Sequence, residues 1–161
     1  MGKLAALTGS DNYFEDFQPG QVFRHARGKT VEVIDNVQIT NLVMNTAEPH
    51  FNAHAVLSNP MFKERVSFGG VNIALVIGLA SQDTAEQALQ ELGMDKIRLR
   101  APVHHGDTLY AYSEVLEAKD ASRPDAGEVR FKHYGVNQHD KVVFEGERRV
   151  LLKRRSHWAQ K

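Results

Sequence analysis

The feature that most constrains the fold is an apolar run near the middle of the chain. Gly69 and Gly70 open this run, and residues 71–80 are almost free of polar side chains. This length and this composition predict a helix buried in the core. A buried strand is the alternative, because short apolar runs are ambiguous by periodicity. The polar residues 82–92 extend the predicted helix, which ends at Gly93.

The chain after this run alternates between apolar and polar residues, as β-strands do. Strands are predicted at residues 96–100, 108–116, 129–136 and 141–152, with turns at 105–107 and 122–127. One long buried helix beside several consecutive strands is an α+β pattern. An antiparallel sheet wrapped around the central helix satisfies this pattern.

Smaller elements are predicted before the apolar run. Residues 30–34 alternate and are β-branched, which predicts a strand. Asp35 is a plausible N-cap, with Gln38 three residues later as its capping-box partner, and together they predict a helix over about 36–44. The irregular segment 51–68 is expected to overhang the body and cover a site.

The chain is organised as a single domain of residues 13–155, with a flexible arm at 1–12 and a C-terminal tail at 156–161. Its 161 residues are enough for a sizeable core, and no repeat or linker divides them. Phe14, Phe17 and Phe23 surround a Pro-Gly turn. We expect this aromatic segment to pack against the body of the domain.

Composition excludes several classes of function. The chain has 20 Lys and Arg residues against 20 Asp and Glu residues, so it lacks the net positive charge of a general nucleic-acid binder. It has no cysteine, which excludes disulfides, thiol nucleophiles and thiolate metal sites. No stretch is long and apolar enough for a signal peptide or a membrane span, so a cytoplasmic protein without a membrane partner is expected.

The candidate chemistry lies in a polar turn over residues 45–52. Pro49 disfavours helical geometry at the residue before it, so the preceding helix ends by this point. The turn can hold the amide of Asn45 near the ring of His50. An imidazole titrates near neutral pH and therefore suits a general base. The alternative is that His50 is a structural residue of a polar turn.

This octapeptide resembles the Asp-x-Asn-Pro-x-His-x-Asp motif of MaoC-like, hot-dog-fold enoyl-CoA hydratases. In this register Asn45 takes the position of the motif Asp and His50 that of the motif His, which is the only identity. The other motif positions, Asn, Pro and the final Asp, are occupied by Ala47, Glu48 and Asn52.

Other segments extend the resemblance over most of residues 14–153. Residues 102–109 resemble the Pro-Val-x-x-Gly-Asp-Thr-Leu strand entry of the family. Gly69-Gly70 resembles its His-Gly-Met helix start, with Phe68 in place of the His. Further segments resemble the branch that acts on mesaconyl-, itaconyl- or methylmalyl-type CoA thioesters; they lie at residues 14–17, 45–47, 50–52 and 122–125.

The resemblance implies a hydro-lyase that adds water to an enoyl-CoA or removes it. His50 is then the base, Asn45 orients the water, and Gly69 and Gly70 present backbone N–H groups to the thioester oxygen. Unlike the family Asp, Asn45 exchanges no proton, so either His50 or Glu48 protonates the α-carbon. A packing role for the two glycines is compatible with this function.

The resemblance also implies a short branched or dicarboxylic acyl group and a homodimer or higher homo-oligomer, with sites near the subunit interface. Arg65 and Arg123 are the candidates for pairing with a second carboxylate. CoA is part of the substrate, and no other cofactor is implied. His50 and His54 have the spacing of a zinc pair but no evident third ligand, so no metal is expected.

Two other functions stay open at this stage. A hot-dog thioesterase also binds acyl-CoA but directs water at the carbonyl carbon. A non-catalytic acyl-CoA-binding domain is suggested by Asn45 at the position of the Asp. The late strands and the tail carry several basic side chains, most of which are expected to face solvent. A subset of them could instead bind the phosphates of CoA. The set is Arg98, Arg100, Arg148, Arg149, Lys153, Arg154 and Arg155.

Overall fold

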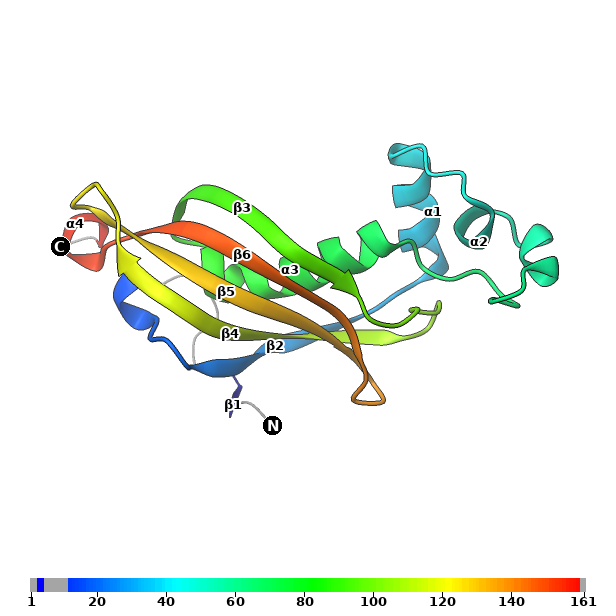
Figure 1. The fold of residues 1–161 in the computed structure, drawn as a ribbon, viewed down its shortest axis with the longest axis horizontal. Coiled ribbons are helices and arrows are strands. Elements are labelled where there is room, and N and C mark those ends of the chain that lie inside the picture. Colours follow the sequence, from blue (N-terminus) through cyan, green and yellow to red (C-terminus); the bar gives the residue numbers. More distant parts are fainter. Residues whose placement is uncertain (1–2, 5–11, 160–161) are drawn as a thin grey trace.

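The computed structural model describes residues 3–4 and 12–159, which form a twisted sheet with one long helix along a face (Figure 1). The sheet order is β1-β2-β4-β5-β6-β3. All neighbouring strands pair antiparallel except the short β1, which is parallel to β2. The strands are β1 (Lys3–Leu4), β2 (Val22–Thr30), β3 (Ala88–Leu99), β4 (Thr108–Asp120), β5 (Ala126–Asn137) and β6 (Val142–Lys153).

The long helix is α3 (Gly69–Ala85), and the sheet curves around it (Figure 1). Its residues Val76 and Ala80 are fully buried against Leu109 of β4 and Phe144 of β6. The prediction of an α+β fold with a central helix is therefore confirmed, and the buried-strand alternative for the apolar run is wrong. Gly69 begins the helix as the sequence predicted.

A second core cluster lies under the N-terminal aromatic segment. Phe17 is buried and meets the ring of Phe131 edge-on, with 5.0 Å between ring centroids. Phe14, in the 3-10 helix η1 (Phe14–Asp16), and Phe23 of β2 pack against the same cluster. This packing confirms the expectation from the sequence. Along β4 and β5, buried and half-buried residues alternate, as expected for strands with one face on the core.

Two local predictions are wrong. Residues 30–34 do not form a strand: β2 ends at Thr30, and α1 (Val33–Leu42) begins at Val33. Glu32 is the N-cap, and the Asp35 side chain accepts the Glu32 N–H at 2.9 Å, so Asp35 acts from inside the first turn. The β-branched pair at residues 33–34 is misleading because it lies on an exposed part of the helix.

The predicted extension of the long helix through residues 82–92 is also wrong. α3 ends at Ala85, and β3 begins at Ala88. From Ala88 to Leu99 the backbone pairs with β6, starting with Leu152. This non-local ladder determines the backbone conformation of a polar stretch whose local pattern favours helix.

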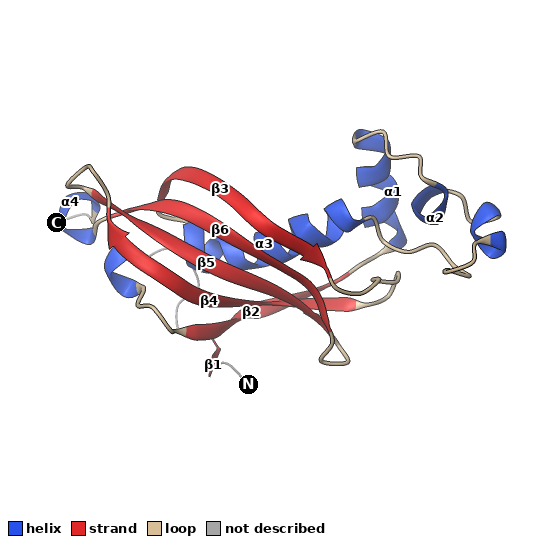
Figure 2. Cartoon of the chain, in the orientation of Figure 1, coloured by secondary structure: helices blue, strands red, loops and turns tan. Residues whose placement is uncertain are grey.

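The segment from α1 to the start of α3 extends beyond the end of the sheet (Figures 1 and 2). We call residues 33–62 the overhang. It contains α1, α2 (Glu48–Phe51) and the 3-10 helix η2 (Ala55–Ser58). Several large apolar side chains of the overhang are exposed, including Leu42 at 82% and Met44 at 85%. The expected irregular segment is thus built from short helical turns joined by loops.

The structure describes the predicted arm and the predicted tail only in part. Most of the predicted arm, residues 1–2 and 5–11, lies outside the described residues, and Lys3 and Leu4 pair with β2. In the predicted tail, α4 (Arg155–Trp158) is helical, and the Trp158 indole donates to the Asp125 carbonyl at 3.0 Å. Residues 160–161 also lie outside the described part. None of the described helices is long and apolar enough to cross a membrane.

Candidate active site

A cavity of about 610 Å³ lies where the overhang meets the start of α3. This volume is within the range of small-molecule sites. Most of its lining is apolar, with polar side chains at only a few points. The lining residues are Pro49, His50, Phe62, Val66, Ser67, Phe68, Gly69, Gly70, Asn72, Ile73, Leu99, Arg100, Ala101 and Pro102.

The geometry of His50 makes its Nε2 atom a proton acceptor. Nδ1 lies 3.0 Å from the carbonyl oxygen of Val66. A carbonyl oxygen only accepts, so Nδ1 carries the proton and Nε2 carries the free lone pair. The half-buried ring packs at 5.7 Å from the ring of Phe68, which restricts its orientation. His50 therefore lines the cavity with Nδ1 as a hydrogen-bond donor, which leaves Nε2 as the acceptor of the uncharged ring.

Asn36, which is fully buried on α1, joins the two halves of the site. Its amide nitrogen donates to the carbonyl of His50 at 2.8 Å, and its amide oxygen accepts the N–H of Phe68 at 2.9 Å. Phe68 is the N-cap of α3. One side chain thus fixes the position of the histidine turn relative to the start of the long helix.

The first turn of α3 presents backbone donors to the cavity. The N–H of Val71 bonds to the carbonyl of Phe68. Within the described part of the chain, the N–H groups of Gly69 and Gly70 bond to no other group. A Cβ at Gly69 would lie 2.3 Å from a methyl carbon of Leu99, so glycine also lets the helix approach β3 closely. The packing role and the donor role of these glycines are compatible.

The structure brings only some of the predicted site residues together. His50, Gly69 and Gly70 line the cavity, whereas Asn45 does not. The Asn45 side-chain oxygen accepts the N–H of Ala47 at 3.1 Å, so it stabilises the turn that leads into α2. A water-orienting role for Asn45 stays a prediction.

The two predicted arginines lie elsewhere. Arg65 is half-buried, beside the cavity-lining Val66, and its charge contributes to lowering the pKa of His105, for which burial is the larger cause. Arg123 lies on the β4–β5 turn and pairs with Asp125, with 2.5 Å between Nε and Oδ1. This turn is at the opposite end of the sheet from the overhang (Figure 1). A carboxylate-binding role for Arg65 or Arg123 stays a prediction.

Sequence reasoning missed Asn36, Ser67 and Asn72. The only signal for Asn36 is a polar residue on the first turns of a short helix, and its partners lie 14 and 32 residues away. Ser67 and Asn72 flank the Gly69-Gly70 pair, and both are buried in the cavity wall. Asn72 could have been found from the sequence, because it is a polar residue inside the most apolar run of the chain.

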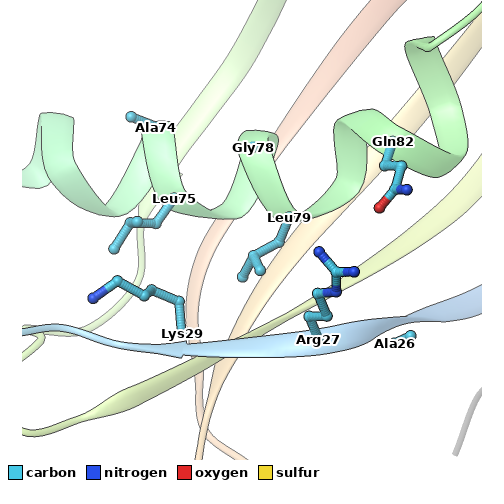
Figure 3. Close-up of a pocket in the computed structure, with 8 residues that line it drawn as sticks. All are labelled: Ala26, Arg27, Lys29, Ala74, Leu75, Gly78, Leu79 and Gln82. Carbon is cyan, nitrogen blue, oxygen red and sulfur yellow. The ribbon is translucent and has the colours of Figure 1, made fainter. Parts of the chain in front are cut away.

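A second hollow lies between β2 and the outer face of α3 (Figure 3). It has a volume of about 290 Å³ and is lined by apolar residues of α3 and by Arg27 and Lys29 of β2. Figure 3 shows the Arg27 side chain beside Gln82, and Leu75 and Leu79 facing the strand. No imidazole or carboxylate is among its described lining residues, so it lacks a base for proton transfer.

A polar chain is buried under the C-terminal half of α3. His25 Nδ1 lies 2.6 Å from Asp83 Oδ2, and His25 Nε2 lies 2.7 Å from the hydroxyl of Ser113. That hydroxyl lies 2.7 Å from Nδ1 of His133. Because the carboxylate accepts from His25, the proton directions follow: Ser113 donates to His25, and His133 donates to Ser113. This chain joins β2, α3, β4 and β5 inside the core and does not line the cavity.

A sheet wrapped around one helix, with a histidine turn facing the start of that helix, defines a MaoC-like hot-dog protein. The chain belongs to the mesaconyl-CoA hydratase family, whose family model matches residues 5–154. It is 36% identical to a beta-methylmalyl-CoA dehydratase from Chloroflexus aurantiacus, over 79% of this chain and 36% of that protein.

Solved structures share this fold. A putative MaoC domain protein dehydratase from Chloroflexus aurantiacus superposes with a TM-score of 0.81 at 28% identity, over 92% of this chain and 46% of that chain. A Mycobacterium tuberculosis protein described as a double hotdog fold superposes with a TM-score of 0.78 at 22% identity, over 93% of this chain and 46% of that chain. The chain spans less than half the length of the curated relatives it matches.

Proposed function

We propose that this protein is an acyl-CoA hydratase/dehydratase that acts on a short branched or dicarboxylic enoyl-CoA of the mesaconyl type. The observation that carries the proposal is the cavity in which the free Nε2 of His50 shares a wall with the unpaired N–H groups at the start of α3. A base and a pair of oxyanion donors are the groups that water addition to an enoyl thioester requires. CoA enters as part of the substrate, and no other cofactor takes part.

The proposed hydration begins with proton removal from water. His50 Nε2 takes a proton from water as the water oxygen forms a bond to the β-carbon. The electrons of the double bond move toward the α-carbon and the thioester oxygen, where the N–H groups of Gly69 and Gly70 and the helix dipole stabilise the negative charge. The imidazolium of His50 then returns the proton to the α-carbon. Glu48 is exposed and does not line the cavity, which favours His50 for both transfers.

A second copy of the chain is the proposed partner. β3 is an edge strand in one copy, and it exposes Met94, Ile97 and Leu99. The overhang exposes a further set of apolar side chains: Val33, Ile34, Leu42, Val43, Met44, Phe51, Leu57 and Met61. Apolar patches and free strand edges of this kind favour association. Light scattering that finds a monomer at micromolar concentration would refute the dimer proposal.

One assay separates the proposed activity from its alternatives. Crotonyl-CoA and mesaconyl-CoA are incubated with the protein, while the absorbance of the conjugated thioester and the release of free thiol are followed separately. Hydration lowers the absorbance without releasing thiol, whereas a thioesterase releases thiol. A binding domain causes neither change.

Substitution of the base tests the residue assignment. His50→Ala is expected to lower kcat by about 10²–10⁴-fold, because general base catalysis contributes this much. His54→Ala is the matched control, since His54 lies four residues away, is exposed and does not line the cavity. Near-unchanged turnover in His50→Ala would show that His50 is not the base.

A further inference from the structure

The hollow between β2 and α3 interrupts a line of side chains that otherwise faces the core. His25 and Val31 stand at the two ends of this line and are buried, with exposed fractions of 1% and 0%. Between them the alternate residues are Arg27 and Lys29, and both line the hollow of about 290 Å³. Core-facing positions of a strand are normally apolar, because burying an unpaired charge is costly. Packing therefore does not explain two cations in the middle of this line.

A bulge in β2 places Arg27 over the hollow. β2 advances by four residues, from Arg24 to Gly28, while its neighbour β4 advances by two, from Tyr112 to Tyr110. The extra residues of a bulge disturb the ladder and change the direction of the side chains that the strand carries. Bulges are frequent beside functional sites for this reason. The hollow thus lies next to a specific irregularity of the sheet.

The two cations of the hollow differ in their partners. The Lys29 ammonium donates to a carboxylate oxygen of Asp35 at 2.6 Å, so its charge is already offset. Within the described part of the chain, the exposed Arg27 guanidinium makes no hydrogen bond or ion pair. Figure 3 shows it beside Gln82, whose side-chain amide has no partner among the described residues either. The hollow therefore has one uncompensated positive charge and an unused amide donor.

The opposite wall of the hollow is apolar and unobstructed. Leu75 and Leu79 of α3 face the strand (Figure 3), and Ala74 and Gly78 are exposed on the same helix. A Cβ at Gly78 would meet no heavy atom within 4 Å, so the space over this turn is open. An apolar wall beside a free guanidinium is complementary to a ligand with an aliphatic chain and an anionic end.

We propose that this hollow binds a small aliphatic carboxylate, at a site separate from the cavity that His50 lines. The described lining residues of the two sites do not overlap. Arg27 pairs with the carboxylate through its fork of N–H groups, and the Gln82 amide donates a further hydrogen bond. The aliphatic chain lies against Leu75 and Leu79 and leaves water there. An alcohol lacks the charge and an alkylammonium is repelled by Arg27, so the site selects anions.

A series of carboxylates tests both parts of the site. Backbone amide shifts are followed by NMR during titration with acetate, butyrate or hexanoate, and they should concentrate at residues 26–29 and 74–82. For hexanoate the expected dissociation constant is on the order of 1 mM. Each added methylene should tighten binding by about threefold, because it buries further apolar area. Hexanol and hexylammonium should bind more weakly than hexanoate by about threefold or more.

Two variants separate the contribution of charge from that of shape. Arg27→Gln should weaken hexanoate by about threefold to tenfold and leave hexanol unchanged. Gly78→Leu fills the open space and should weaken both ligands by about tenfold, while leucine favours the helix more than glycine does. Arg98→Gln is the matched control, since it removes the same charge from an exposed side chain outside the hollow and should leave hexanoate binding unchanged.

Three results would overturn the proposal. Shifts at Gly69 and Gly70 without shifts at the hollow would place the carboxylate in the cavity with His50. Unchanged hexanoate affinity in Gly78→Leu would show that the ligand does not occupy the hollow. If Gly78→Leu keeps its hexanoate affinity but loses self-association in light scattering, this face instead contacts a second copy of the chain.

Discussion

The buried histidine chain makes stability depend on pH in a way that one substitution should reveal. His133 is fully buried, and burial lowers its pKa from 6.5 to about 3, with smaller contributions from the nearby Arg148 and His25. Burial also lowers the pKa of His25, against the opposing effect of Asp83. In the folded protein His133 therefore stays neutral over a range in which the unfolded chain binds a proton.

The sign and size of the effect follow from linkage. Between pH 6.5 and about 3 the unfolded state binds more protons at this residue, so the free energy of unfolding falls as pH falls through this window. Above pH 6.5 both states are neutral at this position and the contribution is close to zero. For a folded pKa of about 3, lowering the pH from 7.5 to 5 costs roughly 2 kcal/mol from His133 alone.

The measurement is urea unfolding at fixed protein concentration, at several pH values between about 5 and 7.5. His133→Asn keeps an acceptor or donor near the Nδ1 position for Ser113 and removes the titration. As the pH falls over this range, we expect the free energy of unfolding of the wild type to decrease by roughly 2 kcal/mol more than that of His133→Asn. This comparison does not depend on how far the stabilities of the two proteins differ at pH 7.5. Equal pH slopes in the two proteins would refute the argument, because His25 and His105 titrate in both.

The remaining predictions concern the turn and its link to α3. Asn45→Asp keeps the side-chain oxygen that accepts the Ala47 N–H and should retain turnover, whereas Asn45→Ala loses this hydrogen bond and should lower kcat. An unchanged kcat in Asn45→Ala would show that Asn45 has no role in turnover. Asn36→Ala should lower kcat and also destabilise the fold by about 1–3 kcal/mol, because it leaves the Phe68 N–H without its bond. Asn36→Asp places a carboxylate oxygen against the His50 carbonyl oxygen in a fully buried position, so it should lose at least as much stability in urea unfolding as Asn36→Ala.

The local pattern of apolar and polar residues was sufficient to predict the long helix and the later strands. The Gly69-Gly70 pair followed by an apolar run predicted the start of α3, and alternation predicted the later strands, because burial against one core imposes these periods. The boundary at residues 85–88 could not be predicted this way, since pairing with β6 decides it. His50 was found through its motif position, and the structure places it in the cavity.

Other site residues depend on contacts that sequence spacing does not reveal. Asn36 bonds to the site residues only because the chain returns to it twice, at the His50 carbonyl and at the Phe68 N–H. Arg100 is one of several alternating basic residues on the last strands, and only its place at the end of β3 brings it to the cavity. The sequence also did not reveal that the side chain of Asn45, which stands where the family motif has Asp, accepts a hydrogen bond within its own turn.

The two hydrogen bonds of Asn36 make it possible to measure how often the cavity opens. His50 belongs to the overhang, whereas Gly69 and Gly70 belong to the body, so access to the cavity widens when these two parts separate. Separation must break the bond from the Phe68 N–H to Asn36, and that amide then exchanges its hydrogen with solvent. The hydrogen-exchange rate of the Phe68 amide therefore measures how often the overhang separates from the body and opens the cavity. A bound thioester that holds the two parts together is expected to slow this exchange.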